Sequence, residues 1–190
     1  ESMKWFKSAS DQGDVRAPFA ISIAYRQGKG NAVKKDLGKW EEWLRKSAEL
    51  GFAEAQEELG RSLFSGEDIE KNLKEARLWL GRSALQGFVR AQNGYAMLLL
   101  EGYGGPKDLI HGFKWALIAA HAGSRDAQRA LFGVEESLTR AQKLQAKKLA
   151  EDFAPRIERR LSTVGKSAPK DIKALRAAAA QGKPEAQFEL

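Results

Sequence analysis

The sequence predicts an all-α protein, an α-solenoid of stacked helix-turn-helix repeats. Two observations predict this fold. First, a nine-residue phrase that begins with Trp and ends with Gly occurs four times: WFKSASDQG at 5–13, WLRKSAELG at 43–51, WLGRSALQG at 79–87 and WALIAAHAG at 115–123. The period between successive glycines is 38, 36 and 36 residues. Second, alanine and large apolar residues recur within each period at intervals of four, the spacing of one helix face.

The first helix of each period is predicted to run from just after the repeated glycine to about fifteen residues beyond it. Alanine stands four residues after each glycine and a large apolar residue stands eight after it. These residues are Ala17, Ala55, Ala91 and Ala127, then Ile21, Leu59, Tyr95 and Leu131. Gly28, Gly66 and Gly102 end the first three of these helices, because glycine adopts the left-handed conformation without strain.

A second helix is predicted to follow a short loop in each period. Asp36, Asn72 and Asp108 each stand seven residues before a repeated Trp, and such side chains cap helix N-termini. The Trp is then the large residue that this helix buries, and the small residues four and five after it leave room for a neighbouring helix. One such pair cannot bury its apolar face alone, so three or more copies are expected to stack.

The repeats assign residues 1–137 to one array, a partial first unit and about four units in all. The opening ESMKWFKSAS lies within a unit, so we expect the chain to be an excerpt of a longer protein. In the fourth unit Phe132 replaces the small residue found at that position in the others, as expected of a terminal unit.

The remainder of the chain is predicted to form three further segments. Residues 138–161 are expected to be C-terminal capping helices, kinked or restarted at Pro155 because proline disrupts a helix interior. Residues 162–173 are predicted to be a linker. Residues 174–190 start a further unit, with Gly182 in register.

The repeated phrase resembles the Sel1-like repeat, a relative of the tetratricopeptide repeat. The clearest copies are AQEELGRSLFSG at 55–66 and NLKEARLWLGRSALQG at 72–87, and the resemblance covers about residues 1–137 and again 174–190. It implies antiparallel helix pairs in a right-handed superhelix and a protein-binding adaptor. Family members act in bacterial signalling, the cell envelope, host interaction and eukaryotic endoplasmic-reticulum quality control. Some relatives are linked to β-lactam hydrolysis, but those arrays are cysteine-paired and this chain has no Cys.

In arrays of this kind the first helices line the concave face, so we expect a partner protein or peptide to bind there. The candidate residues stand three, six, ten and thirteen positions after each repeated glycine. They are Arg16, Phe19, Ile23, Arg26, Glu54, Glu57, Arg61, Phe64, Arg90, Asn93, Met97, Leu100, Asp126 and Arg129. Apolar anchors surrounded by Arg and Asn are typical of a peptide groove. The alternative for the apolar members is packing against adjacent units.

The charge distribution suggests an alternative function. The chain carries a net charge of +7, and residues from 139 onward hold twelve Lys and Arg against six Asp and Glu, which accounts for +6. Binding of nucleic acid or another polyanion by the basic C-terminal helices is therefore the second hypothesis. Nucleic acid is the less favoured partner, because these charges also suit the solvated side of an amphipathic helix and no aromatic residues interleave them.

The sequence predicts neither an enzyme nor a catalytic, cofactor or metal site. His111 and His121 are ten residues apart, which is not ligand spacing on a helix, and no Cys assists them. The loop GYGGPKD at 102–108 lacks the ending that binds phosphate and magnesium.

The longest apolar runs, such as YAMLLL at 95–100, are too short to span a bilayer. We therefore expect a soluble chain, either periplasmic or secreted from a bacterium, or cytoplasmic. Self-association through the half-repeats at the two ends is a further alternative.

Overall fold

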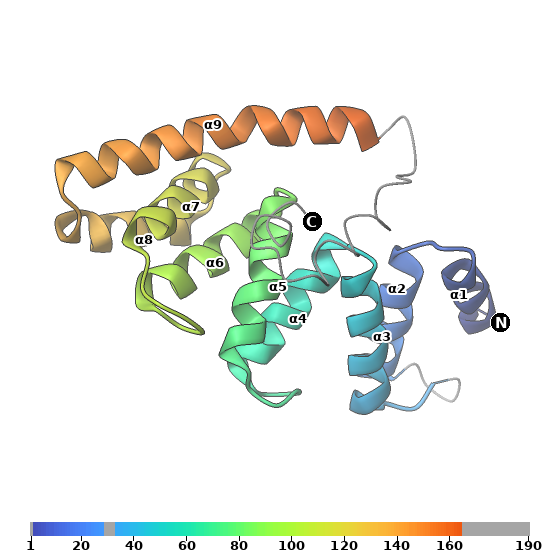
Figure 1. Ribbon diagram of the computed structural model, residues 1–190. Coiled ribbons are helices and arrows are strands. Elements are labelled where there is room, and N and C mark those ends of the chain that lie inside the picture. Colours follow the sequence, from blue (N-terminus) through green and yellow to red (C-terminus); the bar gives the residue numbers. More distant parts are fainter. Residues whose placement is uncertain (1, 29–32, 165–190) are drawn as a thin grey trace, which may run out of the picture.

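The computed structural model describes residues 2–28 and 33–164, with side chains from residue 3 to residue 153 within those ranges. Every regular element in these residues is a helix, and the helices stack into a curved array (Figure 1). They are α1 (Ser2–Asp11), α2 (Arg16–Gln27), α3 (Leu37–Glu49), α4 (Ala53–Ser65), α5 (Leu73–Leu85), α6 (Val89–Glu101), α7 (Leu109–His121), α8 (Arg125–Val134), the short 3₁₀ helix η1 (Glu135–Ser137) and α9 (Arg140–Val164). The all-α solenoid expected from the sequence is confirmed.

Each repeat is a pair formed by a first and a second helix: α2 with α3, α4 with α5, and α6 with α7. Every second helix also packs against the first helix of the next repeat, which stacks the pairs. The predicted caps are present, because side-chain oxygens of Asp36, Asn72 and Asp108 accept hydrogen bonds from the backbone N–H three residues on, at 2.9, 3.1 and 3.0 Å. The glycines at 51, 87 and 123 turn the chain with φ of 94°, 89° and 91°.

The core runs between the helices of each pair and on into the next repeat. One cluster joins Trp40 and Leu44 of α3 to Leu59 and Leu63 of α4 and reaches Trp79 of α5. A second cluster extends from α5 through α6 to α7, and a third joins α7 to α9. This continuity is what a stack of individually unstable repeats requires.

The repeated Trp does not have the same burial in every repeat, which corrects the sequence prediction. Trp79 and Trp115 are buried as expected, whereas Trp43 is only half-buried and Trp5 of the first copy is 76% exposed. In the repeat that contains Trp43, the core position belongs to Trp40, almost one helical turn earlier, where α5 has Ala76. A second large side chain at this point moves the Trp of the repeated phrase toward the surface.

The small and polar residues of the phrase form hydrogen bonds between helices, as well as leaving room. Ser47 Oγ donates to the carbonyl of Val15 and Ser83 Oγ to that of Ala53, both at 2.7 Å. Each bond ties a second helix to the start of the first helix of its own repeat. The amide of Gln56 donates to the carbonyl of Ala48 at 2.9 Å, and thus ties α4 back to the preceding repeat.

The fourth repeat departs from this pattern. Its first helix, α8, packs against α7, but the following helix α9 also packs along α7 rather than beside α8. Where capping helices kinked or restarted at Pro155 were predicted, α9 is one helix from Arg140 to Val164. Residues 165–190, which hold most of the predicted linker and the predicted further unit, lie outside the described residues.

Candidate protein-binding surface

The first helices lie on the inner side of the curved array. In the described part of the chain, α4 contacts α6 and α6 contacts α8, whereas the second helices α3, α5 and α7 make no contact of that extent with one another. Elements on the inside of a curve are closer together than those outside it, so the first helices line the inner face. The residues that the sequence singled out as a binding surface therefore lie on the inner helices.

A continuous row of ion pairs crosses this face over three repeats; we name it the ion-pair ribbon, and it comprises Asp68, Arg26, Glu58, Arg61, Glu57 and Arg90. It begins at Arg26 of α2, whose guanidinium pairs with Asp68 at 2.8 Å and with Glu58 of α4. The same guanidinium lies 4.8 Å from the ring centroid of Trp40. Three contacts thus hold Arg26, and the two ion pairs join the first repeat to the second.

The ion-pair ribbon continues along α4 and on to α6. Glu58 accepts from Arg61 at 2.8 Å, and Arg61 Nε lies 3.9 Å from Glu57 Oε1. Glu57 Oε2 in turn lies 3.3 Å from a guanidinium nitrogen of Arg90, the second residue of α6. Acids and bases alternate along the row, which agrees with the mixture of charges that the sequence places on this face.

Glu57 is the unusual member of the ion-pair ribbon, because only 3% of the residue is exposed. Its Oε2 has no hydrogen bond of good geometry among the described residues, although it lies beside Arg90. Burial raises the pKa of the Glu57 carboxyl above its ordinary value, and the nearby Arg90 opposes that change only in part. The carboxylate is held beneath the two arginines and is not presented to solvent.

The other predicted residues of the inner face differ in exposure. Arg61 and Arg90 are largely exposed, with 55% and 72% of their side chains accessible, although both are paired with carboxylates. Met97 is the exposed apolar residue, and Glu54, Asn93 and Ile23 are half-buried. In the middle of the array the exposed candidates are thus Arg61 of α4 and Arg90 and Met97 of α6.

Of the five apolar anchors that the sequence offered, two are committed to aromatic packing and a third is buried outright. Phe19 packs edge-on against Phe52, and Phe64 lies 5.8 Å from the ring of Tyr103. Leu100 is buried against α7 because Gly112 leaves it space, so it is not part of any surface and the expectation for it was wrong.

The residues at the two ends of the array do not join the ion-pair ribbon. Arg16 pairs with Asp14 beside it, and Arg129 pairs with Asp126 on the same helix at 2.7 Å. Both pairs are local and exposed, and contacts of this kind contribute little to stability.

Glu58 and Asp68, the two acids that pair with Arg26, are not among the residues predicted from the sequence. The available signal was the position of Glu58 seven residues after the repeated glycine, which turns it toward the preceding first helix.

Other chemistries have little support in the geometry. His111 Nδ1 lies 2.8 Å from Asp108, the cap of its own helix, and His121 Nδ1 lies 2.9 Å from the carbonyl of Leu117. No group of three or more potential metal-ligating His, Cys, Asp or Glu side chains was found in the described ranges. Within those ranges no helix combines the length and the apolar character needed to cross a bilayer.

Comparison with known proteins gives one family and several similar structures. No curated protein matches the chain. A Sel1 repeat protein from Oxalobacter formigenes is 30% identical, with 70% of this chain and 98% of that chain covered and a TM-score of 0.64. The antigen c5321, a protective antigen present in uropathogenic Escherichia coli strains and displaying an SLR fold, is 22% identical. The match covers 88% of this chain and 44% of that chain, with a TM-score of 0.59. Cysteine rich protein B of Helicobacter pylori is 17% identical, and the match covers 68% of this chain and 92% of that chain, with a TM-score of 0.52.

The family model of the Sel1 repeat matches residues 1–14, 19–52, 53–88 and 89–124. The last two matches begin at the first residues of α4 and α6. They end one residue after Gly87 and Gly123, the glycines that follow α5 and α7. The chain therefore belongs to the Sel1 repeat family.

Proposed function

We propose that this chain is a non-catalytic scaffold that binds a partner protein or peptide through the inner face formed by α2, α4 and α6. Sel1 repeat proteins are generally protein-interaction scaffolds, which supports the general role. The observation that supports this particular face is the ion-pair ribbon, which crosses three repeats and leaves two of its arginines largely exposed.

Arginines held in this way are suited to recognition. Arg61 and Arg90 are oriented by carboxylates beneath them, so binding a partner costs less side-chain entropy than it would for a free arginine. Each guanidinium carries five N–H donors, and the contacts with Glu57 and Glu58 use only some of them. The partner that suits this surface has carbonyl or carboxylate oxygens placed over the two arginines.

The apolar part of the surface is small and adaptable. Met97 of α6 is 38% exposed, and its flexible thioether side chain can fit partners of different shape. Half-buried Ile23 extends the apolar area on α2. The proposed partner segment therefore combines an apolar side chain with hydrogen-bond acceptors.

The absence of cysteine from the chain allows a direct test with a matched control. Met97→Cys and Leu78→Cys place single thiols at residues of similar exposure, 38% and 42%, on an inner first helix and an outer second helix. Each variant carries a photoreactive maleimide and is illuminated in extract of the source organism. We expect a protein to be cross-linked from position 97 and not from position 78.

A second measurement connects the capture to the arginines. Arg61→Glu should weaken binding of the captured protein at least tenfold, about 1.4 kcal/mol, because it removes the guanidinium and places an acid beside Glu57 and Glu58. Equal cross-linking from both positions, or from position 78 alone, would refute the inner face. Recovery of nucleic acid instead, with binding that falls steeply as salt is raised, would establish the polyanion alternative for the basic C-terminal helices.

A further inference from the structure

In the described part of the chain, no helix covers the face of α8 that corresponds to the docking face of a second helix. In the second repeat that face is formed by three residues of α4: the carbonyl of Ala53 accepts from Ser83, the side chain of Gln56 accepts from Gln86, and Gly60 lies against Leu80. All three partners belong to α5 or to the residue that follows it. This face of a first helix is therefore where its own second helix packs.

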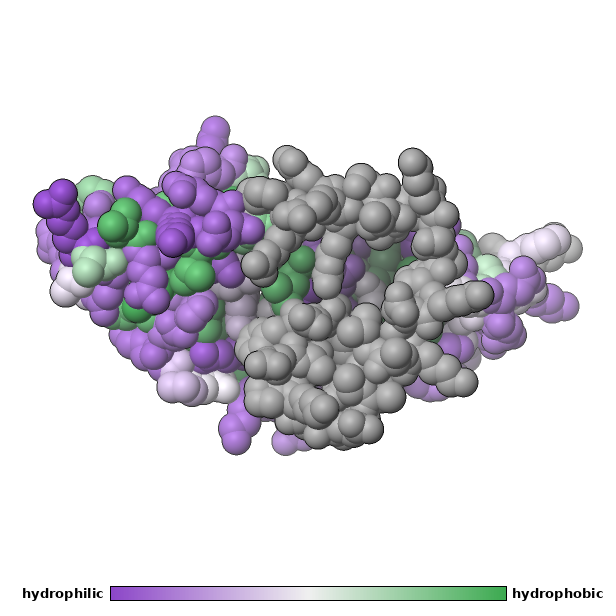
Figure 2. All heavy atoms as spheres, turned by 45° about the horizontal axis from the view of Figure 1, so that its top comes forward, coloured by the Kyte–Doolittle hydropathy of each residue, from purple (hydrophilic) through white to green (hydrophobic). Residues whose placement is uncertain are grey.

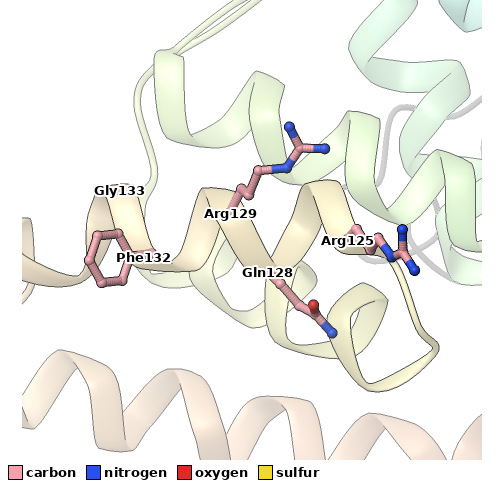
Figure 3. A pocket seen from close by; sticks show the side chains of 5 residues that line it. All are labelled: Arg125, Gln128, Arg129, Phe132 and Gly133. Atoms are coloured by element: carbon pink, nitrogen blue, oxygen red, sulfur yellow. The ribbon is translucent and has the colours of Figure 1, made fainter.

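The matching positions of α8 are two, five and nine residues after Gly123, which are Arg125, Gln128 and Phe132. These residues line an open pocket together with Arg129 and Gly133 (Figure 3). None of the helices from α1 to α9 fills it as a second helix, because α9 packs along α7 instead. In Figure 3 the side chains of Arg125, Gln128, Arg129 and Phe132 project from α8, and the ribbon of α9 passes without lying over them.

Phe132 shows how far this face differs from its counterparts. It is 84% exposed, whereas Ser22 and Gly60 at the same position of earlier repeats are buried. A large ring replaces a small residue, so a helix that docked here would receive the ring between small side chains of its own. The space-filling view shows hydrophilic atoms dominating the end of the molecule formed by α7, α8 and α9, with apolar atoms only scattered among them (Figure 2). A helix on this face would therefore need polar contacts around one aromatic anchor.

The charges of the pocket select the occupant. Arg125 and Arg129 line it and no acid does; the nearby Asp126 pairs with Arg129 at 2.7 Å but leaves Arg125 without an ion pair among the described residues. Pairing of this face with the same face of a second copy would bring four of these arginines together, which like-charge repulsion disfavours. A helix with acidic residues would instead complement both arginines.

We propose that this face of α8 is a docking site for an acidic amphipathic helix of a partner protein. The helix takes the place that α5 holds beside α4, with small residues over Phe132 and carboxylates beside Arg125 and Arg129. This site is separate from the ion-pair ribbon and does not depend on the proposed function of the inner face.

The test uses the complete chain and two fluorescent peptides that have the sequence of residues 72–87, the helix that fills the equivalent place in the second repeat. Both carry Leu80→Ala, which supplies a small residue for Phe132, and one also carries Lys74→Glu, Arg77→Glu and Arg82→Glu. Fluorescence anisotropy measures their affinities. We expect the acidic peptide to bind at least ten times more tightly than the other, with an affinity that falls as salt is raised.

Variants locate the peptide on the chain. Phe132→Ala and Arg125→Glu should each weaken the acidic peptide at least tenfold, while Leu144→Ala, which removes an exposed apolar residue of α9 outside the pocket, should leave it unchanged. Arg61→Glu on the inner face should also have no effect, so the two proposals fail independently.

Three results would overturn the docking site. The first is equal affinity for the two peptides, or no binding of either to a chain that far-UV circular dichroism shows to be folded. The second is binding that survives Phe132→Ala. The third is a dimer of the chain alone that Phe132→Ala abolishes in sedimentation, because a second copy would then be the occupant.

Discussion

Gly60 and Gly133 offer the same substitution in opposite surroundings, and alanine at each should change stability with opposite sign. Gly60 lies inside α4, where an added Cβ would approach Leu80 Cγ to 2.8 Å, the backbone N of Leu80 to 3.1 Å and the carbonyl oxygen of Ala76 to 3.2 Å. Gly133 lies in the last turn of α8, where an added Cβ would meet nothing within 4 Å.

Two effects set the magnitude. Alanine in place of glycine stabilises a helix by roughly 0.5–1 kcal/mol, through the lower entropy of the unfolded chain. At Gly60 the contacts involve backbone atoms and a branched carbon rather than a flexible end, so α4 and α5 must separate slightly, at a cost of about 1–3 kcal/mol. Gly60→Ala should therefore destabilise by about 1 kcal/mol in total, and Gly133→Ala should stabilise by about 0.5 kcal/mol.

Urea unfolding followed by far-UV circular dichroism and by tryptophan fluorescence measures both free energies, and agreement of the two probes checks that unfolding is cooperative. The difference between the two variants cancels most of the helix-propensity effect and isolates the steric one. If Gly60→Ala proves as stabilising as Gly133→Ala, then α4 and α5 are not in close contact at this residue, and the comparison of α8 with α4 loses its basis.

Three further changes test the contacts of the repeats. Ser83→Ala should cost about 1 kcal/mol in urea unfolding, because it removes the hydrogen bond by which α5 is tied to the carbonyl of Ala53, although alanine fits the same position at Ala119. Glu57→Gln should raise the stability of the chain at pH 7. The pKa of Glu57 is raised in the folded protein, so the native protein loses stability as pH rises from the ordinary value of 4.5 through the folded pKa. Below pH 4.5 Glu57 is protonated in both states, and the unfolding free energies of the native protein and of Glu57→Gln should become equal there. Arg26→Lys should destabilise by about 1 kcal/mol, because an ammonium cannot bridge Glu58 and Asp68 in the same fork; an unchanged urea midpoint would show that the bridge contributes nothing.

Much of the fold could be predicted because it depends on short-range relations along the chain. A cap such as Asp108, a closing glycine such as Gly123 and the residues between them set the ends of α7 through backbone and side-chain hydrogen bonds within a few positions. Spacings of four set which residues share a face. The candidate surface was placed on the first helices by the same relations, together with the resemblance to the family.

The exposure of individual residues on those helices could not be predicted, because it depends on what each helix meets across the array. Leu100 and Phe64 occupy equivalent positions, yet Leu100 is buried where Gly112 leaves space and Phe64 is only half-buried beside Tyr103. The burial of Glu57 depends likewise on Arg90, one repeat further along the chain. Helix periodicity gives the angle of a side chain but not the neighbour found at that angle.

The sequence by itself thus determined the repeats, their helix boundaries and their caps, because local spacing and hydrogen bonding are sufficient for these features. The tertiary structure alone decided that α9 packs along α7, that the face of α8 around Phe132 stays open, and that Arg26, Glu58 and Arg61 form one row across the repeats. The physical reason is that these features depend on how helices from different repeats approach one another, and residues that meet there are about thirty or more positions apart in the chain, as Arg26 and Glu58 are.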